Sequence, residues 1–214
     1  MAYVPVLAGK RDDLLETAGR RWAALVVARP DLGPAVALQR RFLGIVIDLG
    51  AALEAGRLPR LSLPPKYLAA KLARGVPVFA GEPIPLPVPA LRSTMLRLCD
   101  ALASGGAGDA AAHIHAAIDR GHIEAGSLLA ASLKRDQAAI RTGAVHRGLS
   151  PDLVWLVAEL AVSPFVHALQ RLLFAPAGHA TLSAALAAWN RGHCPACGSW
   201  PALAEVVEIG RAHV

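Results

Sequence analysis

Cys194-Pro195-Ala196-Cys197-Gly198-Ser199-Trp200-Pro201 is the stretch around which the rest of the sequence is organised. Two cysteines three residues apart, with proline after the first and glycine after the second, are typical of a metal-binding knuckle, because a tight turn brings both thiolates to one side. Proline pre-sets the φ of such a turn, and glycine tolerates the positive φ that lets backbone N–H groups point at the sulfurs. We therefore predict that Cys194 and Cys197 are metal ligands.

The competing interpretation is a dithiol redox pair, in which the first cysteine lies at a helix N-terminus and the helix dipole lowers its pKa. Here Gly198, Ser199 and Pro201 follow the second cysteine instead, and residues 202–209 are rich in β-branched side chains, which favour a strand. A knuckle followed by a strand is the start of a rubredoxin-like or zinc-ribbon hairpin. The redox pair and an incidental pair stay open as alternatives.

A tetrahedral metal site needs four ligands, and the sequence contains no second Cys-x-x-Cys. His213 is a candidate third ligand, although a terminal histidine is more often solvated, and His193 is the other candidate if a metal is held tightly. We therefore expect a fragment, or a chain truncated within its metal domain. Two thiolates and water should bind iron or zinc weakly, or only where two chains pair as a homodimer.

The composition favours helices, because apolar residues make up 54% of the 214 residues, much of it Ala and Leu, and aromatic residues only 5%. Three cysteines and the lack of a secretory leader predict a reducing cytoplasm, and Cys99, inside a helical pattern, is expected in the core. The formal charge is +6, with the 22 Lys and Arg residues scattered. The longest basic run without an acidic residue predicts a solvated face or docking of an acidic partner, and consists of Arg57, Arg60, Lys66, Lys71 and Arg74.

Apolar residues recur at helical spacing along most of the chain, as in the stripe of Leu14, Ala18, Trp22 and Leu25. We therefore predict an all-α fold with at least seven helices and no sheet of more than two strands. The helices are expected near residues 11–28, 34–55, 66–74, 89–103, 110–120, 123–133, 135–147, 151–174 and 182–189, with Pro164 kinking or dividing the eighth. The predicted core residues on such stripes are Trp22, Leu25, Phe42, Leu49, Leu156, Leu160, Leu169 and Leu172.

Two segments interrupt this pattern. Five prolines between residues 76 and 89 forbid a helix, so we expect an extended, partly buried segment whose N–H groups need solvent or side-chain partners. Residues 104–108 (Ser-Gly-Gly-Ala-Gly) are the best linker in the sequence. We predict a helical domain over residues 1–190, with a sub-boundary at 104–109, and a partial rubredoxin-like knuckle over 191–214. The expected anchors of the proline segment are Val78, Phe79, Ile84, Leu86 and Val88.

Motifs for catalysis are missing from the sequence. It contains no Gly-rich phosphate loop before a helix, no His-Glu-x-x-His and no Gly-x-Ser-x-Gly. His113 and His115 are two residues apart and so point to different faces of a helix. We therefore predict that the chain is not an enzyme. The most apolar span, residues 153–174, cannot cross a membrane without burying Glu159 and Arg171, so no membrane partner is expected.

The order of these features resembles the formate dehydrogenase accessory protein (FdhE) family: helices, a proline-rich segment, more helices, then Cys-Pro-x-Cys-Gly-Ser-x-Pro. The most specific match is the knuckle over residues 194–201, together with the strand expected after it. A second match runs from Pro151-Asp152-Leu153-Val154-Trp155 to Ser163-Pro164-Phe165, where the family often has Arg-Pro-Phe. The helical remainder agrees in order and length.

The resemblance implies a cytoplasmic maturation factor that associates with the catalytic subunit of molybdenum- or tungsten-containing formate dehydrogenases. Members carry rubredoxin-like knuckles with several Cys-x-x-Cys pairs that bind iron or zinc, and Cys194 and Cys197 match the first pair. The other pairs have no counterpart in this sequence. The alternative function is a zinc-ribbon nucleic-acid-binding module. We disfavour it because only Arg191 and Arg211 lie near the knuckle in the sequence.

Overall fold

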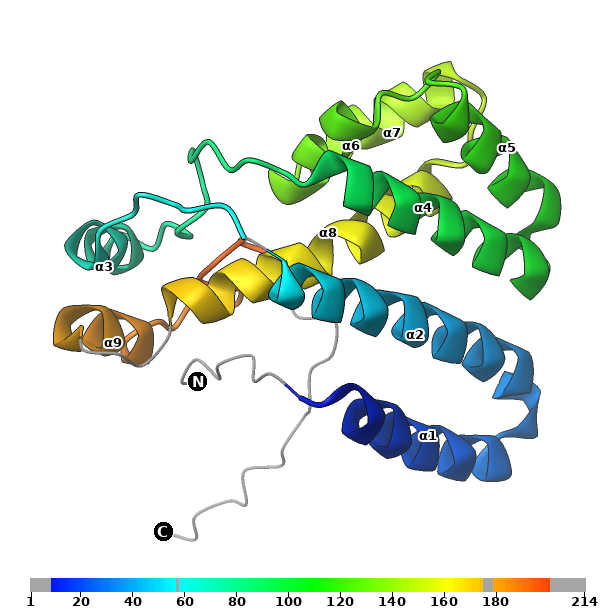
Figure 1. The fold of residues 1–214 in the computed structure, drawn as a ribbon, viewed down its shortest axis with the longest axis horizontal. Helices are drawn as coiled ribbons and strands as arrows, with labels where there is room; N and C mark the ends of the chain where they lie inside the picture. Colours follow the sequence, from blue (N-terminus) through cyan, green and yellow to red (C-terminus); the bar gives the residue numbers. More distant parts are fainter. Residues whose placement is uncertain (1–8, 57, 175–178, 201–214) are drawn as a thin grey trace, which may run out of the picture.

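The computed structural model describes residues 9–56, 58–174 and 179–200, and over these ranges the chain is helical with irregular connections and no strand (Figure 1). The all-α prediction and the expectation of at least seven helices are therefore confirmed. The expected strand at residues 202–209 lies outside the described residues. The helices are α1 (Arg11–Ala28), α2 (Gly33–Ala55), α3 (Pro65–Ala73), α4 (Val88–Leu102), α5 (Gly108–Asp119), α6 (Ala125–Leu133), α7 (Gln137–His146), α8 (Pro151–Leu173) and α9 (Ala180–Ala187).

The central element is α8, which packs against α2, α4, α6 and α7. It begins as the sequence predicts, with Ser150 before the helix and Pro151 in its first turn, where the missing N–H costs nothing. Pro164 lies inside the helix without dividing it. By length and composition α8 is the one described helix that could cross a membrane, yet 56% of its most apolar window is buried inside the protein. Its apolar character therefore serves the core, where Phe165 and Leu169 are fully buried.

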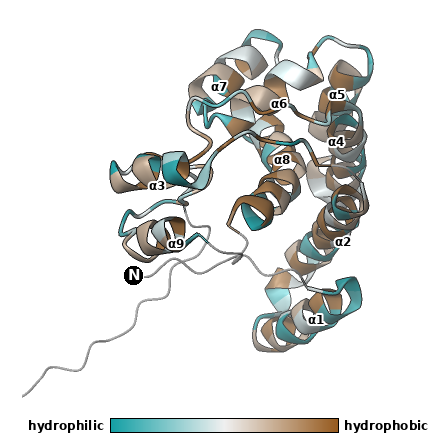
Figure 2. Cartoon of the chain, turned by 60° about the vertical axis from the view of Figure 1, so that its left-hand side comes forward, coloured by the Kyte–Doolittle hydropathy of each residue, from teal (hydrophilic) through white to brown (hydrophobic). Residues whose placement is uncertain are grey.

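The errors in the predicted core fall on the peripheral helix α1 and in the last turn of α8. Helix α1 packs on α2 along one side and lies at the edge of the molecule, so it contains no fully buried residue (Figure 2). Leu25 is 41% exposed there, and Leu172, in the last turn of α8, is 54% exposed. Predicting these two as core was wrong. Trp22, Leu156 and Leu160 are half-buried, whereas Phe42, Leu49 and Leu169 are buried as predicted.

Residues 104–108 do not form a flexible linker. They lie in a wide helical turn, Ala103–Ala107, that joins α4 directly to α5, and these two helices pack on one another. Gly106 adopts a φ of 110°, which a residue with a side chain rarely reaches, and this lets the chain reverse. Arg41 on α2 donates to Ser104 Oγ at 2.6 Å, which holds the turn against the bundle. The glycines therefore allow the chain to reverse direction between α4 and α5, and do not form a flexible linker.

The helices α3 and α9 pack against each other at one end of α8, although they lie over a hundred residues apart in the sequence (Figure 1). Leu68 and Leu72 of α3 and Leu182 of α9 are buried in this contact region. We call residues 58–82 and 179–200 together the α3–α9 lobe. In Figure 2 the lobe and the α2–α4 pair lie on opposite sides of α8. The predicted metal ligands belong to this lobe.

Candidate functional site

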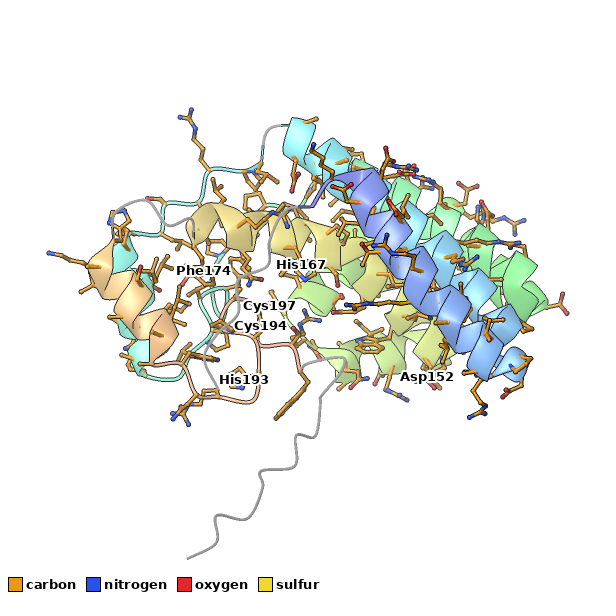
Figure 3. All side chains as sticks on the ribbon, turned by 90° about the horizontal axis from the view of Figure 1, so that it is seen from below. Asp152, His167, Phe174, His193, Cys194 and Cys197 are labelled. Carbon is orange, nitrogen blue, oxygen red and sulfur yellow. The ribbon has the colours of Figure 1, made fainter. Side chains whose placement is uncertain are left out.

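The Cys194–Ser199 segment folds into the tight turn that the sequence predicts. The N–H of Gly198 donates to the carbonyl of Cys194 at 2.9 Å, and the N–H of Cys194 donates to the carbonyl of Ser199 at 2.8 Å. Gly198 has a φ of +76°, as expected of the glycine in such a knuckle. A side chain at this position would also approach Pro77, because a Cβ atom would lie 3.2 Å from its Cγ. The two thiols are half-buried and lie side by side (Figure 3).

The knuckle is hydrogen-bonded to the proline-rich segment. The N–H of Val78 donates to the carbonyl of Pro195, and the N–H of Phe79 donates to the carbonyl of Ala196, both at 2.9 Å. The sequence predicted solvent or side-chain partners for these N–H groups, whereas the structure supplies backbone carbonyls. Residues 76–87 are non-helical and partly buried, as predicted, but the predicted segment ran to residue 89 and α4 already begins at Val88, because Pro89 fits the first turn of a helix. The predicted anchors are confirmed too: Val78 and Phe79 are buried, and Ile84, Leu86 and Val88 pack against the core.

Lys71 satisfies the carbonyl groups of the same segment. Its buried ammonium donates to the carbonyls of Val78 at 2.9 Å and Ala80 at 2.6 Å, and to Glu82 Oε1 at 2.6 Å. The Tyr67 hydroxyl also donates to Glu82 Oε1 at 2.6 Å. These two hydrogen bonds, that of Lys71 above all, lower the pKa of the Glu82 carboxyl. The sequence missed this role, although Lys71 falls between Leu68 and Leu72 on the apolar stripe of its helix.

Cys197 has a cation beside its sulfur. Arg135, just after α6, donates from Nη2 to Cys197 Sγ at 3.2 Å, and Ser199 Oγ lies 3.1 Å from the same sulfur. The pKa of the Cys197 thiol is lowered, first by a hydrogen bond from Cys194, then by Ser199 and Arg135. The pKa of Cys194 is raised in turn, because its proton is held by Cys197. One sulfur of the pair therefore carries the negative charge.

Arg135 is itself held in place by α8. Its Nη1 forms an ion pair with Glu159, and Glu159 accepts a further hydrogen bond from Ser132 Oγ at 3.0 Å. Arg135 also has a φ of 61°, a left-handed conformation that costs energy in a residue with a side chain. Neither Arg135 nor Glu159 was among the predicted site residues. Both lie on segments distant from the knuckle in the sequence, so no local pattern could have identified them.

The described residues do not complete a metal site. They contain no group of three or more His, Cys, Asp and Glu that could hold a metal ion. The ring of His193 packs edge-on against Trp189, at 5.2 Å between centroids, and Trp200, at 6.2 Å, while His213 lies outside the described residues. The cation next to Cys197 is the Arg135 guanidinium. These residues fit a thiol–thiolate pair with a resident organic cation better than they fit tetrahedral Zn or Fe.

The remaining cysteine and the histidine pair lie outside the knuckle. Cys99 is buried in α4, and burial raises the pKa of its thiol to about 12, as expected of an unreactive core residue. His113 on α5 is exposed, and His115 is half-buried with Nε2 3.7 Å from Asp100. The two histidines therefore lie in different environments.

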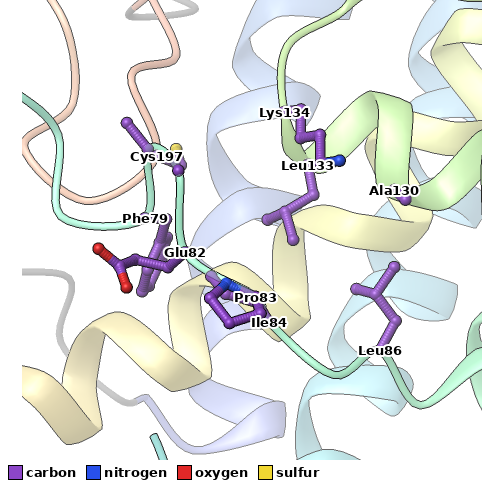
Figure 4. Close-up of a pocket in the computed structure, with 11 residues that line it drawn as sticks. Phe79, Glu82, Pro83, Ile84, Leu86, Ala130, Leu133, Lys134 and Cys197 are labelled. Carbon is purple, nitrogen blue, oxygen red and sulfur yellow. The ribbon is translucent and has the colours of Figure 1, made fainter. Parts of the chain in front are cut away.

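A groove opens between the proline segment and the end of α6 (Figure 4). Its volume is about 680 Å³, and its walls are mainly aliphatic and aromatic. Cys197 lines one side and Lys134 the other, and Glu82 lies among the apolar lining residues. Its apolar lining residues include Phe79, Ile84, Leu86 and Leu133. The knuckle thus borders a cavity large enough for several side chains of a partner.

The α3–α9 lobe, to which the knuckle belongs, carries more positive than negative charge. Its described residues include five basic side chains and one carboxylate, Glu82, which Lys71 already binds. Arg191 lies against the backbone of α3's C-terminal turn, because a Cβ atom on Gly75 would be 2.8 Å from its guanidinium. Packing of α3 on α9 therefore brings Arg191 close to the end of α3, which lies far from it in the sequence. The four exposed cations are Arg60, Lys66, Arg74 and Arg191.

Comparisons with protein families, with curated proteins and with solved structures found no match to this chain. Functional conclusions therefore come from its own residues and their geometry.

Proposed function

We propose that this chain is an accessory protein that binds the catalytic subunit of a molybdenum- or tungsten-containing formate dehydrogenase in the cytoplasm during maturation. The proposal begins with the resemblance of residues 194–201 and 151–165 to the corresponding motifs of the accessory protein family. One observation carries it further. The N–H groups of Val78 and Phe79 bind the carbonyls of Pro195 and Ala196, so the proline segment and the knuckle form one surface.

This surface suits binding rather than catalysis. It combines an apolar groove of about 680 Å³ with exposed cations, which together can hold a polypeptide. We therefore assign the chain a role in holding another protein.

Metal is secondary in this proposal. A complete site of iron or zinc would supply binding energy that fixes the knuckle in place. In this chain hydrogen bonds from Arg135, Val78 and Phe79 hold the knuckle instead. Cys194 and Cys197 would then bind iron or zinc weakly, or through two copies of the chain that each contribute a pair.

The deciding experiment is a pull-down with the tagged chain as bait. The prey is the formate dehydrogenase catalytic subunit, and the control prey is the catalytic subunit of an unrelated molybdenum enzyme. Selective retention of the first supports the proposal. No retention at micromolar concentration, or equal retention of both, contradicts it.

A nucleic-acid-binding module is the second candidate function, and one observation favours it. Arg191 lies against Gly75, the residue after Arg74, and Trp200, just after the knuckle, is 78% exposed and could stack on a base. This candidate predicts oligonucleotide binding that falls steeply between about 50 and about 200 mM salt. Titration of the chain with labelled single-stranded and duplex DNA at both salt concentrations tests it.

A further inference from the structure

We propose that the α3–α9 lobe docks an acidic polypeptide segment whose aliphatic side chains enter the groove beside Cys197. The lobe supplies the positive charge, and the groove supplies the apolar surface. This inference specifies the surface used for the partner proposed above, and rests on that proposal only for the identity of the partner. The chemistry of the segment follows from the residues of the lobe.

The first argument is the charge on the lobe. The exposed cations of the lobe are Arg60, Lys66, Arg74 and Arg191. Within the described part of the chain, none of them forms an ion pair with a carboxylate. The carboxylate of Glu82 is bound by Lys71 and Tyr67. Elsewhere the basic side chains are commonly paired: Arg11 with Asp48, Arg92 with Asp119, Arg141 with Asp152 and Arg171 with Glu54. The lobe therefore presents positive charge that a partner's carboxylates can neutralise.

The second argument is the link between the cations and the groove. Arg74 lies close enough to Tyr67 for its charge to affect the phenol, and the Tyr67 hydroxyl donates to Glu82 on the groove wall. On the opposite wall Lys134 is exposed at the end of α6. One cation, Lys134, therefore lines the apolar cavity itself, and Arg74 lies near Tyr67, which is hydrogen-bonded to the other wall. A bound segment would place carboxylates on these cations and aliphatic side chains between them.

The third argument separates a polypeptide from a nucleic acid. Phosphates would satisfy the cations as well as carboxylates do, and Trp200 could stack on one base. Nucleic acids have no aliphatic side chains, however, to fill a groove lined by Phe79, Ile84 and Leu86. An acidic polypeptide with leucine or isoleucine residues satisfies both parts of the surface. The observations therefore favour a polypeptide partner.

The test uses the full chain and fluorescent synthetic probes. The main probe is a peptide in which glutamate alternates with leucine. Two matched peptides carry glutamine in place of glutamate, or serine in place of leucine, and a single-stranded oligothymidylate represents nucleic acid. We expect the main peptide to bind, each matched peptide to bind about tenfold more weakly, and the oligonucleotide to bind more weakly than the main peptide.

Charge reversal on the lobe tests its location. The double variant Arg74→Glu with Arg191→Glu should weaken binding of the main peptide about tenfold or more. The control variant, Arg21→Glu with Arg120→Glu, changes the net charge equally at exposed positions outside the lobe and should change the affinity by less than about twofold. Circular dichroism of both variants shows whether the helices are intact.

Each contrary result overturns the inference. Equal losses in the two double variants would show a response to net charge alone. Equal affinity for the leucine and serine peptides would exclude the groove, and tighter binding of the oligonucleotide would favour a nucleic acid. If the charge-reversed lobe variant retains the formate dehydrogenase subunit as the wild type does, the docking surface is wrong and the proposed function stands. If the peptide binds the chain but the formate dehydrogenase subunit does not, the docking surface is supported and the proposed function is contradicted.

Discussion

At the scale of single residues, Lys71 holds the proline segment through three hydrogen bonds. Its ammonium binds two carbonyls and the Glu82 carboxylate in a buried position. Lys71→Met removes the donor and leaves Glu82 with Tyr67 alone. We expect a loss of roughly 3–5 kcal/mol in the free energy of unfolding, measured by urea denaturation. Lys66→Met, at an exposed position on the same helix, should change it by less than about 0.5 kcal/mol, and equal effects would contradict this role.

The same ion pair makes stability depend on pH. Lys71 lowers the pKa of Glu82 below its ordinary value of 4.5, so the carboxylate stabilises the folded chain above that value. As the pH falls through the lowered pKa of the folded state, Glu82 is protonated and this contribution is lost. We expect the urea midpoint of the wild type to fall below about pH 4.5. The fall should be shallower in Glu82→Gln, and parallel curves for the two proteins would contradict the assignment.

Two glycines should respond to alanine with opposite signs. Gly198 has a φ of +76° and faces Pro77, so Gly198→Ala should destabilise the chain by about 1–2 kcal/mol. Gly19 lies within α1 with open space around it, and Gly19→Ala should stabilise the chain by roughly 0.5–1 kcal/mol. Thermal denaturation of both variants measures the difference. No destabilisation by Gly198→Ala would contradict the knuckle turn, and destabilisation by Gly19→Ala would contradict the open space around Gly19 in α1.

At the scale of the elements, the final turns of α8 separate two leucines that the sequence pattern treats alike. Leu169 is fully buried, whereas Leu172 is 54% exposed. Leu169→Ala should cost roughly 2–5 kcal/mol of unfolding free energy, because it leaves a cavity in the core. Leu172→Ala should cost less than about 0.5 kcal/mol. Similar losses in urea denaturation would place Leu172 in a contact that the structure does not describe.

The knuckle makes a separate prediction about metal. Two thiolates beside the Arg135 guanidinium should not hold Zn or Fe through mild chelation, because far less binding energy is available than from four ligands. Elemental analysis of the purified chain, before and after chelation, measures this. Size-exclusion chromatography distinguishes a metal shared by two copies. One metal ion per monomer that survives chelation would show that further ligands complete the site, with His213 as the first candidate.

At this scale the sequence predicts correctly those features that depend on interactions between residues close together in the chain. The helices, the proline segment and the Gly198 turn are set by spacing and by backbone preferences, and they are confirmed. The glycines at residues 104–108 indicate a reversal but do not say whether it is loose or tight. That depends on Arg41, 63 residues away, which binds Ser104. Which face of α1 is covered depends likewise on neighbours that a periodic pattern does not identify.

At the scale of the whole molecule, the candidate site could be predicted only in part. The two cysteines and their turn are evident from the sequence, whereas Arg135, Glu159 and Lys71 gain their roles through tertiary contacts. The basic lobe also arises from packing, since α3 and α9 each carry few charges. Identification of such a cluster requires the fold.

The pairing of the proline segment with the knuckle also has a consequence for synthesis of the chain. Val78 and Phe79 emerge from the ribosome more than a hundred residues before Pro195 and Ala196, the carbonyls that they bind. Until then their amides have only water as a partner, and α3 lacks the helix against which it packs. The lobe therefore closes last, after the bundle around α8 has formed. A ribosome-bound nascent chain cannot use this surface, so docking is restricted to protein whose synthesis has passed the knuckle.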